Sequence, residues 1–437
     1  MYPKYTVSAC DHGLTEGEAF QTAAIQAAID DVFTHGGGEV TIPAGRYLTG
    51  GLRLRSGVTL HLLENACLLG SQDPDDYDIL ERDTLEPIPH DDAHKRALSR
   101  WNHGLIMLVD AENVAIIGEK GSVIDGCDCY DPVGEEHYRG PHGIHAINSR
   151  NLTFCGYTIQ NTGNWAHCIL SCRAIEAENL TVLAGHDGFH VRACENIRVE
   201  HCVFHTGDDA IAGFADLNMV VRDCELNSAC SDFRFGGTNV LCERIHAFGP
   251  GIYGHRYTMS KEEQAQMLPT NDTHRHNTLA FFTYFCTDEL PLRAEPGNMI
   301  FRDCVVEGPD RFFQFNFSGS DPWQSGSGVK NVRFENMKVS GVSMPTVVYA
   351  AESLPVVMEM RDLTYSLREG FENIDVIQVG NFERLSFHNV SFPNNASGHL
   401  IRAWGNEGIL EQDNLEAGVG ETEVLIRADQ SFASARI

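Results

Sequence analysis

Three aspartates give this sequence its clearest chemical signal. Asp187 lies in the glycine-flanked run Gly185–Gly188, and Asp208 and Asp209 directly follow Gly207. Asp187 and Asp208 are 21 residues apart, so a repeat of that length would bring them to the same face of neighbouring chain turns. Three carboxylates held that close repel one another and raise the pKa of at least one. An acid and a base then coexist, as hydrolysis of a glycosidic bond requires.

A purely structural role competes with this interpretation. Acidic side chains at turns accept hydrogen bonds from backbone N–H groups, and this accounts well for any single aspartate. It accounts less well for three in register, flanked by glycines that let a ligand approach the backbone. The spacing therefore favours a catalytic cluster.

A repeated phrase predicts the elements that position these aspartates. Asn followed by apolar, any and apolar residues recurs, and the copies at Asn196, Asn218 and Asn239 are 22 and 21 residues apart. Alternating apolar residues are typical of half-buried strands. A period near 21 without helices indicates a solenoid of parallel strands, with coils ~4.8 Å apart. Because Asn tolerates the left-handed conformation of a tight bend, these three asparagines should stack at one corner.

The ends and insertions differ from the repeat. We predict one domain over 1–437, with an N-terminal cap and first coil in 1–50, loop insertions at 71–103 and 253–278, and a C-terminal tail without clear repeat at 394–437. A helical pattern at 20–33 would cap the open end of the solenoid. Its apolar face comprises Ala24, Ile25, Ala28, Ile29 and Val32.

Composition excludes several classes of protein. The 437 residues are 42% hydrophobic, which is too apolar for a disordered chain, and no apolar run is long enough to span a membrane. Sixty-one acids against 32 bases give a net charge of −29. Such a surface repels nucleic acid and anionic lipid, so neither is an expected partner. The sequence leaves the oligomeric state open, a homo-oligomer included.

The cysteines bear on the cellular compartment. The start of the chain shows no secretory signal, and Cys202 and Cys224 lie in similar strand contexts 22 residues apart. We read the 14 cysteines as mostly buried free thiols, without the paired Cys-x-x-Cys motifs of zinc sites. Together these features favour the cytoplasm; a processed form that has lost a signal would be secreted. His186 and His190, and likewise His201 and His205, are four residues apart. On strands this spacing does not form the chelating pair that it forms on a helix, so no metal is predicted, and no cofactor either.

The sequence resembles the polygalacturonase family, glycoside hydrolase family 28. The resemblance lies in 20–70, in Ile124-Asp125-Gly126 and in 161–213. The family's Asn-Thr-Asp-Gly and Gly-Asp-Asp motifs correspond here to Gly185–Gly188 and to Gly207-Asp208-Asp209. The resemblance implies an all-β, right-handed parallel β-helix of the pectin lyase type and hydrolysis with inversion. The resemblance also implies that Asp208 is the general acid and that Asp187 and Asp209 activate the water. Inversion requires acid and base to be about 6.5–9.5 Å apart.

Two family motifs are altered. Where the family has Gly-His-Gly, residues 229–237 contain no His, and Arg234 occupies the strand expected to face the substrate. Where the family has Arg-Ile-Lys, Tyr253 and His255 stand in place of the Arg and the Lys, and Arg256 follows. Arg234 or Arg256 either binds a substrate carboxylate through a bidentate fork or pairs with the aspartates.

Other candidates for substrate binding are aromatic or imidazole side chains. Trp165 either stacks on a sugar ring or braces its loop. The substrate-binding candidates are Trp165, His186, Arg234, Tyr253, His255 and Arg256.

The leading functional hypothesis is a glycoside hydrolase acting on a pectin-type or related plant oligosaccharide, exo-acting because the two long insertions can wall off a groove. A second is a uronan lyase or epimerase on the same solenoid, with an Arg as base and calcium held by Asp187, Asp208 and Asp209. A third is a non-catalytic carbohydrate-binding β-helix. The retained aspartates argue against the third, because an inactive site has no reason to keep mutually repelling acids.

Overall fold

A computed structural model describes residues 5–17, 19–80, 101–266, 274–286, 294–317 and 325–428. Contacts divide the chain into two compact units. The first comprises Met1–Asp208 with Tyr253–Arg275, and the second Asp209–Ile252 with His276–Ile437. Parallel strands dominate both units, and the single domain over 1–437 stays a prediction.

The first unit consists of coils whose strands form three parallel stacks, each strand pairing with its equivalent one coil away. One stack holds β1 (Tyr5–Ser8), β2 (Gly38–Ile42), β5 (Val58–Leu62), β8 (Glu112–Gly118), β11 (Arg150–Cys155), β14 (Arg173–Glu178) and β17 (Glu195–Glu200). The next holds β3 (Gly45–Thr49), β6 (Ala66–Gly70), β9 (Val123–Asp125), β12 (Thr158–Gln160), β15 (Thr181–Ala184) and β18 (Val203–Thr206). The third holds β4 (Leu52–Leu54), β7 (Gly104–Val109), β10 (His142–Ile147), β13 (His167–Leu170) and β16 (Phe189–Arg192).

The second unit is built the same way, but its later coils are simpler. One stack holds β19 (Ile211–Phe214), β22 (Ser231–Phe235), β25 (Ala280–Tyr284), β28 (Arg311–Asn316), β30 (Thr346–Tyr349), β32 (Ile377–Gly380), β34 (His399–Trp404) and β36 (Glu423–Arg427). Others begin as β20 (Asp216–Arg222), β21 (Glu225–Ser228), β23 (Gly237–Glu243), β24 (His246–Phe248), β26 (Gly297–Arg302) and β27 (Val305–Glu307). They merge into the long strands β29 (Asn331–Val342), β31 (Val356–Leu367), β33 (Phe382–Ser391) and β35 (Ile409–Glu416). The described part of the tail, residues 394–428, therefore continues the coils, although the sequence shows no clear repeat there.

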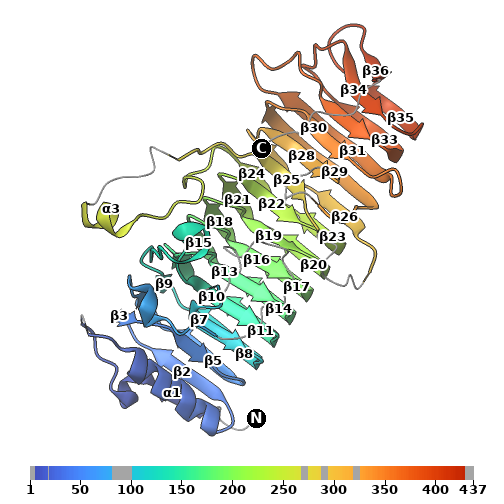
Figure 1. The fold of residues 1–437 in the computed structure, drawn as a ribbon. Helices are drawn as coiled ribbons and strands as arrows, with labels where there is room; N and C mark the ends of the chain where they lie inside the picture. The colour runs from blue at the N-terminus through green and yellow to red at the C-terminus, as the bar shows by residue number, and fades with distance from the viewer. Residues whose placement is uncertain are drawn as a thin grey trace. The chain divides into compact units, whose positions relative to one another are not determined.

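The helix expected near the N-terminus is α1 (Thr22–Thr34). Its buried face consists of Ile25, Ala28, Ile29 and Val32, and it contacts β1, β2, β4 and β5. Figure 1 shows it lying across the first coil of its unit. Burying one apolar stripe against the first coil covers a sheet end that would otherwise expose unpaired backbone.

The repeated asparagines adopt the predicted left-handed conformation. Asn196, Asn218 and Asn239 have φ values of 59°, 60° and 58°. Within the second unit, Asn239 Nδ2 donates to Asn218 Oδ1 at 3.1 Å, which confirms the stacking predicted for that pair. In the first unit, Asn151 Nδ2 donates to Asn113 Oδ1 at 2.9 Å. At these coils the chain thus turns at paired amides, in a conformation that Asn adopts without steric strain.

All fourteen cysteines are free, and most are buried. The Cys202 and Cys224 thiols each donate to the backbone carbonyl two residues earlier, at 3.1 and 3.2 Å. Burial raises the pKa of the Cys304 thiol to about 12, so such thiols stay protonated and unreactive. They pack as small apolar side chains at the turns of the coils.

A thiol count tests this interpretation. Protein denatured without reductant should titrate nearly all 14 cysteines, because none is paired in the structure. A count near zero would mean disulfides and an oxidising compartment, contrary to the predicted cytoplasmic location.

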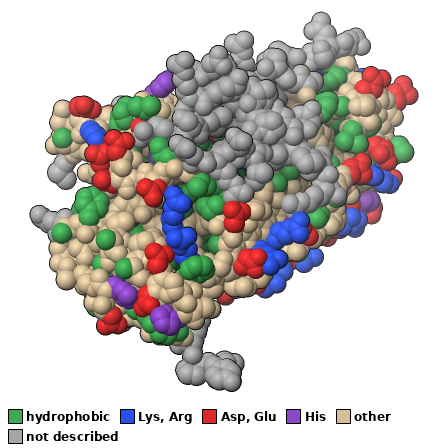
Figure 2. Space-filling view, turned by 60° about the horizontal axis from the view of Figure 1, so that its bottom comes forward, with side chains coloured by type: hydrophobic (Ala, Val, Ile, Leu, Met, Phe, Trp, Pro, Cys, Tyr) green, Lys and Arg blue, Asp and Glu red, His purple; other side chains and the backbone are tan. Residues whose placement is uncertain are grey.

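Charged side chains on the solvent face are paired across coils. Arg150 meets Glu112 at 2.6 Å, and Arg173 meets Glu195 at 3.5 Å. Figure 2 likewise shows Lys and Arg side chains beside Asp and Glu on the visible face. Exposed pairs of this kind contribute little stability, about 0–1 kcal/mol each. Among the described residues, no helix is both long and apolar enough to cross a membrane.

The two predicted insertions are described in part. In 71–103, residues 81–100 lie outside the described residues, and the rest includes a 3-10 helix at Pro74–Asp76. In 253–278, the described residues include the short helix α3 (Lys261–Gln266). The first residues of that insertion reach the candidate site.

Candidate active site

Asp187 and Asp208 lie in equivalent turns of neighbouring coils of the first unit. Ala184, at the end of β15, pairs with Thr206, at the end of β18, so this coil is 206 − 184 = 22 residues long. Asp208 is therefore equivalent to His186, and not to Asp187 as a 21-residue spacing would have it. The one-residue difference leaves the two carboxylates adjacent, with oxygens within 4.8 Å of each other.

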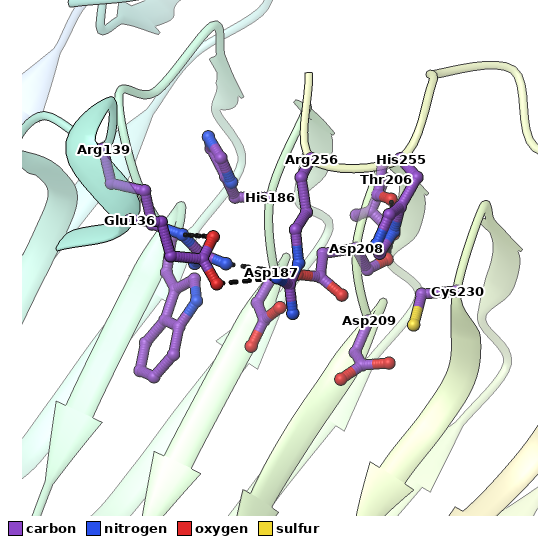
Figure 3. A network of polar contacts seen from close by, with 12 residues as sticks. Glu136, Arg139, His186, Asp187, Thr206, Asp208, Asp209, Cys230, His255 and Arg256 are labelled. Carbon is purple, nitrogen blue, oxygen red and sulfur yellow. Dashed lines mark hydrogen bonds and ion pairs between the residues drawn. The ribbon is translucent and has the colours of Figure 1, made fainter. Parts of the chain in front are cut away.

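Two glycines let the insertion lie directly on these turns. A Cβ atom at Gly185 would collide with the carbonyl oxygen of Tyr257, and one at Gly207 with that of Gly254. In their place, Arg256 N donates to the Gly207 carbonyl and Tyr257 N to the Gly185 carbonyl, both at 3.2 Å. These contacts place the Arg256 side chain beside the aspartates (Figure 3).

Asp187 is fixed as a hydrogen-bond acceptor. Its side chain is buried, and Oδ2 lies 2.6 Å from His190 Nδ1. The other ring nitrogen, Nε2, accepts from Arg192 Nε at 2.8 Å. Because Arg192 can only donate, His190 carries its proton on Nδ1 and donates it to Asp187. A carboxylate oriented in this way is suited to accept a proton from water.

Asp208 belongs to an alternating network of charges. Its Oδ2 lies 3.0 Å from Arg256 Nε and 3.5 Å from an Arg139 amino group. Glu136 contacts the same two arginines, at 2.6 Å to Arg256 and 3.0 Å to Arg139. Figure 3 shows Arg256 between Glu136 and Asp208. Glu135 also lies 3.8 Å from Arg139, so two guanidinium groups meet three carboxylates in a largely buried setting.

This network controls the charge of Asp208. Burial by itself would raise the pKa of the carboxyl group, but Arg256, His255, Arg139 and His186 outweigh burial and hold that pKa below its usual range. Asp208 is therefore ionised with these contacts in place. A general acid must hold a proton, so that role requires Arg256 to separate from Asp208 when substrate binds.

The imidazoles beside Asp208 are neutral. Burial lowers the pKa of His255 to about 4, and His255 Nδ1 lies 3.1 Å from the Gly207 carbonyl, to which it donates. Burial also lowers the pKa of His186, whose Nε2 lies 2.6 Å from the Thr258 hydroxyl. Tyr253 is half-buried, and burial raises the pKa of its phenol.

Trp165 is held by protein groups. Its ring stacks on His190, with centroids 3.6 Å apart and planes 4° from parallel, and the Arg192 guanidinium lies 5.0 Å from its centre. Only 6% of the residue is exposed. Of the two roles expected for Trp165, the structure favours bracing, because it fixes the imidazole that holds Asp187.

Asp209 lies in the second unit and has its own partners there. Its Oδ1 accepts from Ser231 N at 3.1 Å, and its Oδ2 lies 3.7 Å from Arg234 Nε. The Arg234 guanidinium also lies 4.1 Å from the centre of the Phe285 ring. Burial, and then the charge of Asp209, raises the pKa of Asp232 well above its usual range. Arg234 and Arg256 thus both pair with aspartates, one of the two roles that the sequence left open.

Sequence reasoning missed Glu136, Arg139 and Asp232. Glu136 and Arg139 lie in the irregular connection between β9 and β10, around a 3-10 helix at Glu135–His137. Nothing in that segment repeats, so no register related it to Asp208. The only available signal was a dense run of charged residues next to the Ile124-Asp125-Gly126 phrase.

The expected separation of acid and base is not met by Asp187 and Asp208. Their nearest oxygens lie within 4.8 Å, short of the range of about 6.5–9.5 Å associated with inversion. The physical reason is that each carboxylate is fixed by its own partners, Asp187 by His190 and Asp208 by two arginines.

Residues 92–231 match the family Glycosyl hydrolases family 28. A probable polygalacturonase of Vitis vinifera is 30% identical over 213 residues, which are 46% of this chain and 42% of that protein. The chain thus spans less than half the length of this curated relative.

Two solved structures share the fold. The hyperthermoactive exopolygalacturonase of Thermotoga maritima is 18% identical with a TM-score of 0.65, covering 89% of this chain and 92% of that one. The family 28 exopolygalacturonase of Yersinia enterocolitica is 16% identical with a TM-score of 0.60, covering 98% and 78%. The fold is thus the right-handed parallel β-helix with an N-terminal helix, as predicted. The match to glycosyl hydrolases family 28 over residues 92–231 and these two fold matches support the predicted resemblance to that family.

Proposed function

We propose that the chain is a glycoside hydrolase that cleaves a pectin-type or related plant oligosaccharide with inversion. Asp208 is the general acid, and Asp187 and Asp209 activate the water. The observation that carries the proposal is the pair of adjacent carboxylates in opposite settings, Asp187 bound to a neutral His190 and Asp208 bound to two arginines. Carboxyl groups whose environments differ in this way divide into acid and base.

Exo action and a cytoplasmic location belong to the same proposal. The start of the insertion at 253–278, at Arg256 and Tyr257, lies on the turns that carry Asp187 and Asp208, and an insertion rooted there can wall off one end of a substrate groove. The free thiols support a reducing compartment. The partner is then an imported oligosaccharide rather than polymeric pectin.

The test is a screen of pectin-derived oligosaccharides with NMR detection of the anomer first released. The proposal expects one sugar to be released from a chain end with its anomeric configuration inverted. Retention would reassign the carboxylates, in line with the short distance between Asp187 and Asp208. Failure to cleave any glycoside would leave the binding function as the better account.

The lyase or epimerase alternative is less well supported. Calcium prefers several carboxylate oxygens that are free to coordinate it. Asp208 is already paired with Arg139 and Arg256, and a cation at Asp208 would have to displace both. A calcium-selective chelator should therefore leave the rate unchanged, and no unsaturated product should form. Loss of activity with chelator, together with an unsaturated product, would favour the lyase.

A further inference from the structure

A second cluster of side chains lies one coil away from Asp187, on β10 and β13. His145 on β10 is in register with Cys168 on β13, so the two side chains share a face. His142 begins β10, and one donor atom from each of these three residues lies within 4.8 Å of the others. All three residues are completely buried.

The imidazole of His142 points to a missing ligand. Neither of its ring nitrogens has a hydrogen-bond partner among the described residues, although the residue is 0% exposed. Leaving a buried polar group unsatisfied costs about 1–3 kcal/mol. A native structure rarely retains two such atoms on one ring unless something binds there.

His145 is oriented as a ligand would be. Its Nδ1 lies 3.0 Å from the backbone carbonyl of Cys168, which only accepts, so Nδ1 carries the proton. Nε2 is then an acceptor. It lies 3.3 Å from the Asn102 side-chain amide, whose NH2 group must therefore face it, and a metal at Nε2 would take the place of that amide. A backbone carbonyl that fixes the far nitrogen of an imidazole is the usual second layer of a metal-bound histidine.

We propose that His142, His145 and Cys168 bind a thiophilic divalent cation, Zn²⁺ in the first instance. Two imidazoles and a thiolate are donors that zinc prefers, and three protein ligands leave one tetrahedral position. On binding, the thiol proton of Cys168 is released to solvent and a zinc–sulfur bond forms, with no change of oxidation state. The site is independent of the proposed hydrolysis.

The role of the cation follows from what surrounds the cluster. The His142 ring lies 4.6 Å from Trp101 and 5.5 Å from Trp165, measured between ring centroids. Trp165 in turn stacks on His190, the residue that holds Asp187. A metal that joins β10 to β13 would therefore stiffen the wall behind Asp187, as a structural site rather than a catalytic one.

Metal content and cobalt spectroscopy test the site on the full chain carrying no polyhistidine tag. Protein expressed with zinc and passed through a desalting column should retain about one zinc per chain, by mass spectrometry. Replacement by Co²⁺ should give a thiolate-to-cobalt charge-transfer band. Cys168→Ala and His142→Ala should each weaken zinc binding by more than about 100-fold. This loss exceeds the usual effect of mutating a residue that only hydrogen-bonds to a metal ligand.

The matched control is Cys172→Ala, which removes another buried thiol from the same unit but not from the cluster. It should keep both the zinc and the cobalt band. The wild-type spectrum decides the matter even if a variant fails to fold. Absence of a thiolate band, zinc that the desalting column removes, or equal zinc in Cys168→Ala and wild type would each overturn the proposal. Zinc without the band would be adventitious binding to the acidic surface.

Discussion

Replacing Asp208 with asparagine should lower kcat on the natural oligosaccharide by about 10²–10⁴-fold, the usual contribution of general acid–base catalysis. The amide cannot give up a proton to the leaving group. The fold should persist, because Glu136 still pairs with Arg139 and Arg256. Steady-state kinetics on the substrate found by the NMR screen, with circular dichroism as a check of folding, measures the effect.

An aryl glycoside separates the acid from the other two aspartates. A good leaving group needs little protonation, so Asp208→Asn should recover most of its activity on such a substrate. Asp187→Asn and Asp209→Asn should stay slow, since both act on the water. Asp223→Asn is the matched control, because Asp223 pairs with Arg244 in an exposed ion pair. Near-normal rates for all three site variants on the natural substrate would show that the aspartates are structural.

Much of the fold could be predicted because it depends on local rules. Asn218 and Asn239 recur where the backbone takes φ near +60°, and few residues other than Asn and Gly tolerate that conformation. The length of the coil at the site was harder to predict from the sequence. The spacing of Asp187 and Asp208 indicated 21 residues, whereas the strands before them pair at 22. Only strand pairing reveals that Asp208 matches His186, because turns can take up one residue without moving a strand.

The charged network could not be read from the sequence. Arg256 lies 120 residues from Glu136, and both residues belong to irregular segments outside the repeat. Periodicity places residues on strands, but it says nothing about how an insertion folds back. The same limit applies to His142, His145 and Cys168, which β10 and β13 bring together across a coil. The spacing of histidines along the chain singles out His186 and His190 instead, because it compares residues within one segment and not across neighbouring coils.

The second large effect concerns the pH dependence of kcat/KM, which reports pKa values of the free enzyme. If Asp208 is the acid, kcat/KM should fall as pH rises above its pKa, which the arginines hold below the usual range. Arg256→Gln removes the cation nearest to Asp208. A neighbouring cation lowers an aspartate pKa by about 1–3 units, so the falling limb should move up by that amount. At a fixed pH on the limb, the protonated fraction rises about tenfold per unit.

Glu136→Gln should move the same limb in the opposite direction. It removes the carboxylate that shares both arginines with Asp208. Arg139 keeps Glu135 at 3.8 Å, but the charge of Arg256 then acts mainly on Asp208 and lowers its pKa further. Arg173→Gln, at an exposed pair with Glu195 in the same unit, should leave the limb in place. If Arg256→Gln and Glu136→Gln shift the falling limb in opposite directions, the cause cannot be a general loss of packing, which would move both pH profiles in the same direction. A limb that neither variant moves would mean that the proton comes from a group outside this network.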